Sequence, residues 1–528
     1  MMRDDTIDPL LKLGMAIFVG AVMAYFVGLS SSFVTNDDYF HNNARSLFSD
    51  GRFVTGMVYG IFRGAFGPDV NFRGIVSMFA GMTTFLALIS IGRLCIQDLQ
   101  KNVLFSGFSV AIFGAAQFLF FYDMVPLYYL IAMPIIALWA NVLERQMERP
   151  RARTLVLYAL TTTAAIALIL ATLQVIFYLL FVVLAALLLL SERDRQRNLF
   201  WICVISVAAF VVAFASIHVF TRSDLYVSLF GFELRARTSG ELIGDGTLLG
   251  LVPAFASAAI KLPIFAGNTV GLHVFLIAFV MARLLRNGWS QSTLPFLKFA
   301  LLLFAIYLSP FLMFKETLEN VRVTSSIYVY GSIALFLVAF ALIDDERDDR
   351  IVSPGSALLF AAIATAIVAT LIPSGEQQFA TFAGLILLSA VLAAMAFTTT
   401  VSATVALTAA ILIFTGVELR KAQSLTERYQ SYAVVDQIIV SKMNEAIIEN
   451  LYKYGTSRIA IEFGIRDEVI PHTSFRSQSY SSADFWRGTF WLPSMISFKR
   501  NDDLCAAPGS DKVFNLIEST PGSIKFCV

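Results

Sequence analysis

Charged residues are scarce in this chain. Asp, Glu, Lys and Arg make up 15% of its 528 residues, whereas apolar residues make up 57%, and the mean hydropathy is +0.72. Soluble domains carry about 25% charged residues, so this composition excludes an ordinary soluble protein and indicates a polytopic membrane protein. The formal net charge is only +1, which provides no bulk attraction for nucleic acid. We therefore expect no nucleic-acid partner.

Cysteine and histidine are also sparse, with four of each. The histidines are scattered at positions 41, 218, 273 and 472, and no Cys/His cluster has the spacing of a zinc site. We therefore expect neither a structural metal nor a cofactor. Cys505 and Cys527 both fall in the C-terminal tail, where a disulfide would fit an oxidising compartment. Spacing alone leaves that pairing open.

A cleavable signal peptide is not evident. The first apolar stretch is longer than a signal core and lacks a clear small-residue cleavage site before the next polar segment. This stretch predicts a permanent membrane anchor.

Long apolar segments are abundant. Segments of about 18 or more residues are long enough to cross the bilayer as helices, and we count about 13 of them. They lie near residues 10–33, 74–92, 103–121, 124–143, 154–171, 172–190, 199–219, 267–285, 295–314, 326–343, 355–373, 379–397 and 399–418. The sequence thus predicts an α-helical polytopic membrane protein.

The C-terminal tail has a different pattern. Residues 427–451 have a helical pattern, residues 458–463 alternate like a strand, and shorter runs at 489–498, 512–517 and 523–528 are further candidate strands. We expect two domains, a transmembrane body over 1–418 and a small α/β domain over 419–528.

Lys and Arg occur in alternate short loops, which indicates the orientation because positive residues stay in the cytoplasm. The positive set includes Arg93, Lys101 and Arg145, whereas the loops at 122–126 and 372–378 contain no Lys or Arg. A cytoplasmic N-terminus then places two long loops, 34–73 and 222–262, and the tail outside. A miscount of one helix would move the tail to the other side.

An acidic pair, Asp37 and Asp38, follows the first apolar segment. A carboxylate within reach of an acceptor hydroxyl can act as a general base, and adjacent acids can raise the pKa of one member. Alternatively, the pair caps the next helix. Asp123, in another predicted outer loop, is a second acid that can orient a hydroxyl, or a solvated turn residue.

A lipid-phosphate substrate requires a cation at the outer edge of the helices. The candidates are Arg45, Arg235, Arg237, Lys315 and Arg322. Arg322 is favoured because the loop 315–322 is short and lies between two helices. The alternative for each is a snorkelling or topological charge. Aromatic residues that can stack on sugars, or anchor the interface instead, are Tyr39, Tyr122, Tyr128 and Trp486.

These features resemble a known family. Asp37-Asp38, an amphipathic continuation and Asp50-Gly51-Arg52, on about a dozen helices, resemble the integral-membrane glycosyltransferases of the C superfamily. Within it, the chain is most similar to the serotype-converting O-antigen glucosyltransferases of the Gtr type.

The resemblance implies an undecaprenyl-phosphate-linked glucose donor, a lipid-linked or surface glycan acceptor such as O-antigen, and inverting transfer without a metal. It also implies a protein of the bacterial inner membrane that contacts membrane lipid and carries out its reaction at the periplasmic face. Asp37 or Asp38 would be the base, and Arg52 would belong to the substrate site. Asp123 and Arg322 carry over less directly because the family's later loops vary.

Two other functions remain. One is a transporter or lipid flippase, whose site requires ionisable groups or broken helices near mid-membrane. The other is an assembly or sensor protein whose tail binds a partner, although this function does not require the acidic pair. The sequence does not determine the sugar, the acceptor, the linkage, which Asp is the base, or whether a divalent ion on the acidic pair takes part.

Overall fold

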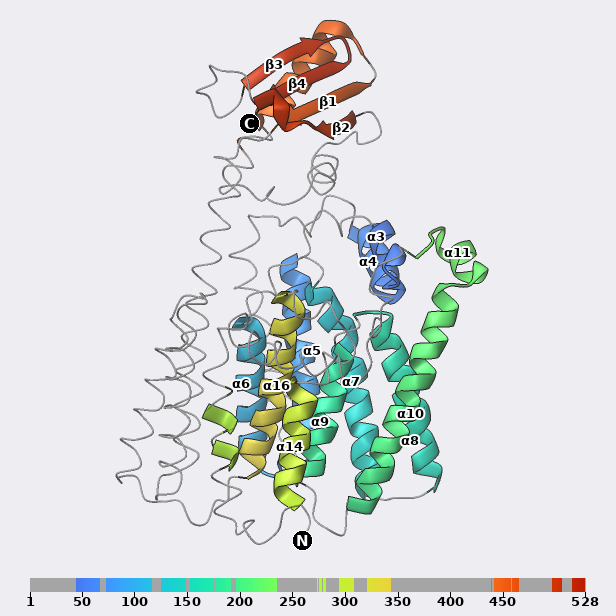
Figure 1. Cartoon of the computed structure of the whole chain (residues 1–528), viewed down its shortest axis with the longest axis vertical. Coiled ribbons are helices and arrows are strands. Elements are labelled where there is room, and N and C mark those ends of the chain that lie inside the picture. Colours follow the sequence, from blue (N-terminus) through green and yellow to red (C-terminus); the bar gives the residue numbers. More distant parts are fainter. Residues whose placement is uncertain are drawn as a thin grey trace, which may run out of the picture.

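The computed structural model is mostly helical, with a small sheet near the C-terminal end (Figure 1). It describes residues 44–66, 73–115, 125–148, 152–173, 176–190, 196–234, 273, 275–277, 279–281, 294–307, 321–342, 438, 441–456, 458–464, 496–505 and 515–527. Its helices are α3 (Ala44–Ser49), α4 (Phe53–Phe66), α5 (Arg73–Gly92), α6 (Leu99–Ala115), α7 (Val125–Glu148), α8 (Ala152–Leu170), α9 (Phe177–Leu190), α10 (Gln196–Thr221), α11 (Asp224–Phe230), α14 (Leu294–Tyr307) and α16 (Val321–Ala341).

Four helices in the described part of the chain are long and apolar enough to cross a membrane. They are Ile75–Gly92, Leu127–Glu148, Ala152–Leu170 and Asn198–Thr221, within α5, α7, α8 and α10. Each coincides with a segment predicted from the sequence, and this agreement supports a membrane protein. Shorter apolar helices in the described residues are Phe53–Phe62, Phe177–Leu190, Leu297–Ile306 and Val329–Ala341. The expected spans at 10–33, 355–373, 379–397 and 399–418 lie outside the described residues.

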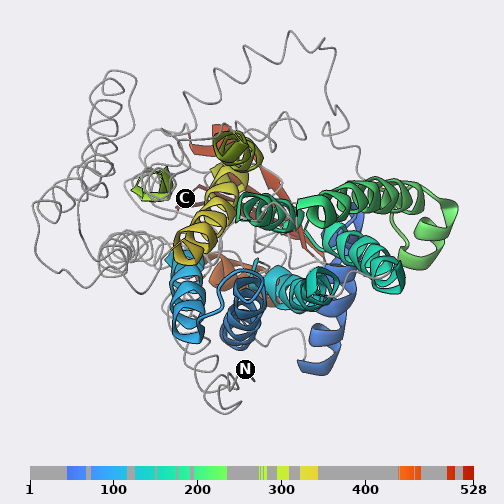
Figure 2. The same cartoon turned by 90° about the horizontal axis from the view of Figure 1, so that it is seen from below.

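From α5 to α10, the end of each helix and the start of the next are close in sequence, so neighbours along the chain run antiparallel. Most side chains of α9 are buried, so this helix belongs to the described core. A helix that is apolar all round belongs in the interior, and α9 contacts α14, α16, α10 and α8. In contrast, α10 lies at the periphery and packs on α8 (Figure 2). Its buried positions form a single stripe: Leu199, Ile202, Ser206, Ala209, Ala213 and Thr221.

One end of the bundle carries three basic residues from the short loops that the sequence predicts to be cytoplasmic: Arg93, Lys101 and Arg153. Arg93, after α5, pairs with Glu144 near the end of α7, with 3.4 Å between Nη2 and Oε1. Lys101 and Arg153 lie near the starts of α6 and α8. The start of α7 and the end of α8 are at the other end, with α3, α4 and α11 (Figure 1).

The C-terminal unit contains a four-stranded sheet of order β2-β1-β4-β3. Its strands are β1 (Ile459–Gly464), β2 (Ile496–Arg500), β3 (Asn515–Thr520) and β4 (Ser523–Cys527). Strand β1 pairs in parallel with β2 and β4, whereas β3 and β4 pair antiparallel. Residues 441–454 are helical and join the sheet through Asn450, which donates to Ser519 Oγ and Thr520 O at 2.9 Å each. The small α/β unit expected from the sequence is therefore present.

Alternating side chains give the sheet a buried and a charged face. The buried face contains Ile459, Ile461, Phe463, Ile524 and Phe526. On the other face, Glu462 is in register with Lys499 on one side and Lys525 on the other, and Lys525 pairs with Glu518. The hydrogen bond from Asn501, followed by the two lysines, holds the pKa of Glu462 below its usual value.

A disulfide closes this unit. Cys505 follows β2 in the 3₁₀ helix η8 (Asp502–Cys505), and Cys527 ends β4. The two residues are bonded, with their Cα atoms 5.2 Å apart. The pairing that spacing alone left open is thus confirmed, and the bond connects the 3₁₀ helix that follows β2 to the end of β4.

Candidate functional site

The turn Asp50-Gly51-Arg52 joins α3 to α4. Gly51 has φ of 74°, a left-handed conformation that glycine adopts without a Cβ penalty. Its N–H donates to Phe48 O at 3.0 Å, and the N–H of Arg52 donates to Leu47 O at 2.8 Å. These are the two bonds of a Schellman motif, which satisfy the last carbonyls of α3. The local sequence therefore fixes the conformation of this turn.

Arg52 contacts the beginning of α7. Its Nη1 donates to the hydroxyl of Tyr128 at 2.8 Å, and its guanidinium carbon lies 5.5 Å from the centroid of the Tyr128 ring. Arg52 is partly exposed, whereas Tyr128 and Asp50 are buried. Burial lowers the pKa of Arg52, but Tyr128 and Asp50 together outweigh it, so the pKa lies above its usual value. The guanidinium is therefore always charged.

The turn is attached to the end of α8 through its backbone. The N–H of Val54 donates to Ala171 O at 3.2 Å, and the hydroxyl of Thr55 donates to Thr172 O at 3.3 Å. Thr55 is fully buried. Both acceptors are carbonyls at a helix end, where carbonyls lack partners within the helix. These bonds therefore provide hydrogen-bond donors for the end of α8 and position α4.

Aromatic rings join the turn to α11. We call the rings of Phe48, Phe53, Phe220, Tyr226 and Phe230 the aromatic clamp. Their centroids are 4.8 Å apart for Phe48–Phe230, 5.3 Å for Phe53–Phe220 and 4.8 Å for Tyr226–Phe230. Aromatic pairs at such distances stabilise a structure beyond the area they bury. The clamp therefore connects α3 and α4 with the α10–α11 corner.

Tyr226 also provides a polar contact in the clamp. Its hydroxyl donates to Phe48 O at 2.5 Å, and Ser223 caps α11 by accepting from the N–H of Tyr226 at 3.3 Å. Burial, with a smaller contribution from Asp50, raises the pKa of Tyr226 to about 12. Tyr226 is thus a neutral hydrogen-bond donor at physiological pH.

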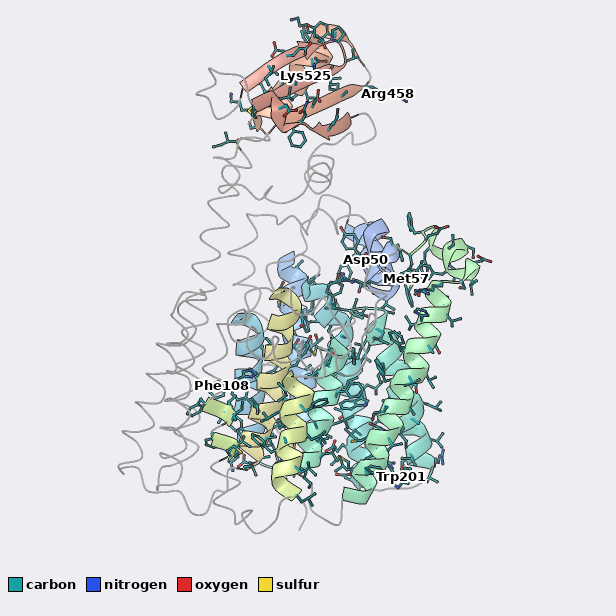
Figure 3. All side chains as sticks on the ribbon, in the orientation of Figure 1. Asp50, Met57, Phe108, Trp201, Arg458 and Lys525 are labelled. Atoms are coloured by element: carbon teal, nitrogen blue, oxygen red, sulfur yellow. A yellow bond between two sulfur atoms is a disulfide. The ribbon has the colours of Figure 1, made fainter. Side chains whose placement is uncertain are left out.

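The resulting arrangement is a fixed cation at the edge of the bundle. The ends of α7, α8 and α11 hold the turn, and Figure 3 shows the labelled Asp50 at that end. A guanidinium has five N–H donors, and among the described contacts Arg52 uses one, toward Tyr128. The remaining donors suit a phosphate or a carboxylate, which arginine binds bidentately.

Most residues singled out from the sequence lie outside the described part. These are Asp37, Asp38, Tyr39, Tyr122, Asp123, Arg235, Arg237, Lys315 and Trp486. Arg45 lies in α3 and Arg322 in α16. Arg52 and Tyr128 are the candidates whose side-chain contacts the structure describes.

Tyr128 has a different environment from the one expected of a sugar-stacking ring. It is 3% exposed and contacts Arg52 instead of presenting a face to solvent. Tyr226 was not singled out because the sequence predicts a loop over 222–262. The signal for α11 was the Ser223 cap followed by an apolar helical pattern.

Among the described residues, no group of three or more His, Cys, Asp or Glu side chains could hold a metal ion. Comparisons with protein-family models, with curated proteins and with solved structures found no match.

Proposed function

We propose that this protein is a glycosyltransferase that moves a sugar, glucose by resemblance, from a polyprenyl-phosphate carrier to a lipid-linked or surface glycan such as O-antigen. The observation that carries the proposal is the Arg52 guanidinium, held by Tyr128 at the edge of an apolar bundle. A phosphate attached to a membrane lipid lies at the membrane surface, where such a cation can bind it.

The chemistry is assigned to the loop that contains this turn. Asp37 or Asp38 would remove the proton of the acceptor hydroxyl as the general base, with inversion at the anomeric carbon. Asp123 would orient a hydroxyl, while Tyr39, Arg45, Arg235, Arg237, Lys315 and Arg322 remain substrate-binding candidates. Arg52 is the proposed contact to the donor phosphate, and no metal is assigned a role.

Two observations support a reaction on the outer, periplasmic side of a bacterial inner membrane. Arg93, Lys101 and Arg153 lie at the opposite end of the bundle from Arg52, which fits cytoplasmic retention of positive residues. The Cys505–Cys527 disulfide fits a tail in an oxidising compartment. We therefore propose a cytoplasmic N-terminus and a periplasmic C-terminal unit.

A transporter or lipid flippase is the second candidate, and two buried polar pairs favour it. His273 is buried, and its Nε2 lies 2.7 Å from the hydroxyl of Ser332, near the middle of α16. The hydroxyls of Tyr129 and Tyr330 are also paired and buried, at 2.8 Å. Ionisable and polar groups within a bundle of apolar helices often mark a transport path.

Sugar transfer by the purified protein in lipid nanodiscs distinguishes these functions. The donor is synthetic polyprenyl-phosphate-glucose, and the acceptor is a lipid-linked glycan. We expect transfer by the native chain and its loss in Asp37→Asn or Asp38→Asn, with folding retained. Comparable activity in both variants would reject the base assignment. If no transfer occurs with several lipid-linked sugars and acceptors, the transport function becomes the better explanation.

Arg52 is tested in the same assay. Arg52→Gln removes the charge and with it one charge-assisted hydrogen bond to the donor. We therefore expect the KM for the donor to rise at least about tenfold. Arg52→Lys keeps the positive charge, so we expect a smaller rise in the KM for the donor. The matched control is Arg93→Gln, because Arg93 is an exposed arginine at the other end of the bundle. Equal donor KM values in all three variants would exclude Arg52 from the donor site.

A further inference from the structure

The face of α4 that points away from the protein is apolar. Its exposed positions in the described side chains are Met57, Gly60, Ile61, Gly64 and Ala65. They recur at the spacing of one helix face, and Ile61 is 70% exposed. A Cβ atom added at Gly60 or Gly64 would meet nothing within 4 Å. A helix surrounded by water would carry polar residues there, so this face requires an apolar neighbour.

A second helix has a similar exposed flank. In α11, Tyr226 faces the protein and is fully buried, whereas Leu225 and Leu229 are 58% and 61% exposed. These leucines are four residues apart and therefore share one side of the helix. Asp224 and Ser228 are exposed on the side opposite Tyr226. This distribution is typical of a helix that lies between water and lipid.

The identity of the neighbour follows from α10, which leads directly into α11. Asn198–Thr221 contains 24 residues, about 36 Å of helix, compared with a hydrocarbon core of about 30 Å. Outside its single buried stripe, α10 exposes large apolar residues from end to end: Phe200, Trp201, Val204, Val207, Val211, Val212, Phe214 and Val219. That surface is appropriate to lipid, and the exposed flank of α11 continues it.

The two short helices lie at the same end of the bundle. Figure 1 shows α4 and α11 beyond the ends of α8 and α10, and Figure 2 shows both extending across the direction of those helices. In Figure 3, the labelled Met57 is at that end and Trp201 is at the other end. The aromatic clamp joins α4 to α11, so they form one unit.

We propose that α4 and α11 form a platform that lies on the bilayer, with Met57, Ile61, Leu225 and Leu229 in contact with the hydrocarbon beneath the lipid headgroups. The occupant of this surface is the lipid of the leaflet at the Arg52 end, not a second copy of the chain. The platform holds the turn Asp50-Gly51-Arg52 at the level of the headgroups. This inference does not depend on the proposed enzymatic activity.

Spin labels test the platform in the full-length protein. Cys95 and Cys203, the two free cysteines, are replaced by alanine, and the disulfide is retained. Single cysteines at the four platform positions are labelled with a nitroxide in phosphatidylcholine/phosphatidylglycerol nanodiscs. Power saturation then compares collisions with oxygen, which partitions into lipid, and with a water-soluble nickel chelate. Val211→Cys in α10 is the lipid reference, and Tyr452→Cys, 94% exposed in the C-terminal unit, is the water reference.

We expect the ratio of oxygen to nickel collisions at all four positions to shift toward the value at Val211. Ser228→Cys, on another side of α11, should stay closer to Tyr452. Ratios at the four positions equal to that of Tyr452 would overturn the proposal. Dipolar broadening between labels on two chains in one disc would overturn it in favour of a dimer interface. Labels at two positions in each helix keep the test valid if one variant misfolds.

Discussion

The contact between Arg52 and Tyr128 is the first feature to test by substitution, and Tyr128→Phe is the most conservative change. It removes the hydroxyl that accepts from Arg52 Nη1 at 2.8 Å and keeps the ring beneath the guanidinium. The volume of this buried side chain is nearly unchanged, so no sizeable cavity contributes. The variant therefore removes the hydrogen bond to Arg52 while the ring keeps its packing.

A hydrogen bond to a charged group contributes about 1.5–3 kcal/mol. Arg52 is partly exposed, so water replaces part of the lost interaction, and we expect the lower end, about 1.5 kcal/mol. The retained cation–π contact, worth about 0.5–2 kcal/mol, is lost in Tyr128→Leu. We expect that variant to be less stable than Tyr128→Phe.

The assay is a double-mutant cycle in the free energy of unfolding, measured by steric trapping in bicelles. Tyr128→Phe is compared in the native chain and in Arg52→Met, which has no guanidinium. We expect a coupling energy of about 1.5 kcal/mol, because the hydroxyl has little value without its donor. A coupling below about 0.3 kcal/mol, the usual error of additivity, would refute the interaction.

Three further predictions concern other parts of the molecule. Tyr226→Phe should remove the hydrogen bond to Phe48. The pKa of Tyr226 in the folded protein, about 12, exceeds the usual value near 10, so the free energy of unfolding of the native chain should fall between pH 10 and 12 more steeply than that of the variant. Unfolding measured at each pH checks this. Replacing Cys505 and Cys527 by serine opens a link across a separation of 22 residues and should lower the stability of the tail by about 3 kcal/mol, measured by the protease resistance of the C-terminal unit; unchanged resistance would argue against a stabilising disulfide. Gly331→Ala should lower the free energy of unfolding by about 1–3 kcal/mol through overpacking, because the new Cβ would lie 2.6 Å from a side-chain carbon of α14. A free energy of unfolding equal to that of the native chain would show that α14 and α16 separate easily.

The sequence was informative wherever the apolar pattern alone decides the structure. The segments 74–92, 124–143, 154–171 and 199–219 correspond to helices able to cross a membrane, because uninterrupted apolar length is a property of the chain. The expected strand at 458–463 corresponds to β1 for a related reason, its strict alternation. The boundaries of β2 and β3 differ from the runs at 489–498 and 512–517, since pairing with neighbouring strands determines where a strand begins and ends.

The candidate site was less predictable. The tight turn at Gly51 is a local property, and the sequence motif with Arg52 was noticed. Its partner Tyr128, however, is 76 residues away, and the sequence offered Tyr128 only as a sugar-stacking or interface-anchoring ring. The clamp residue Tyr226 lies in a segment expected to be a loop. Neither the Arg52–Tyr128 contact nor the Tyr226–Phe48 contact has a sequence signal, because each depends on which helix ends meet.

By itself, then, the sequence determined the membrane class, the positions of the long apolar helices and the separate character of the tail, since composition and periodicity act locally along the chain. Tertiary structure decided that Cys505 bonds to Cys527, that His273 lies beside Ser332 and that Arg52 rests on Tyr128. Each of these contacts joins residues brought together by packing, and packing depends on the shapes of whole helices and strands.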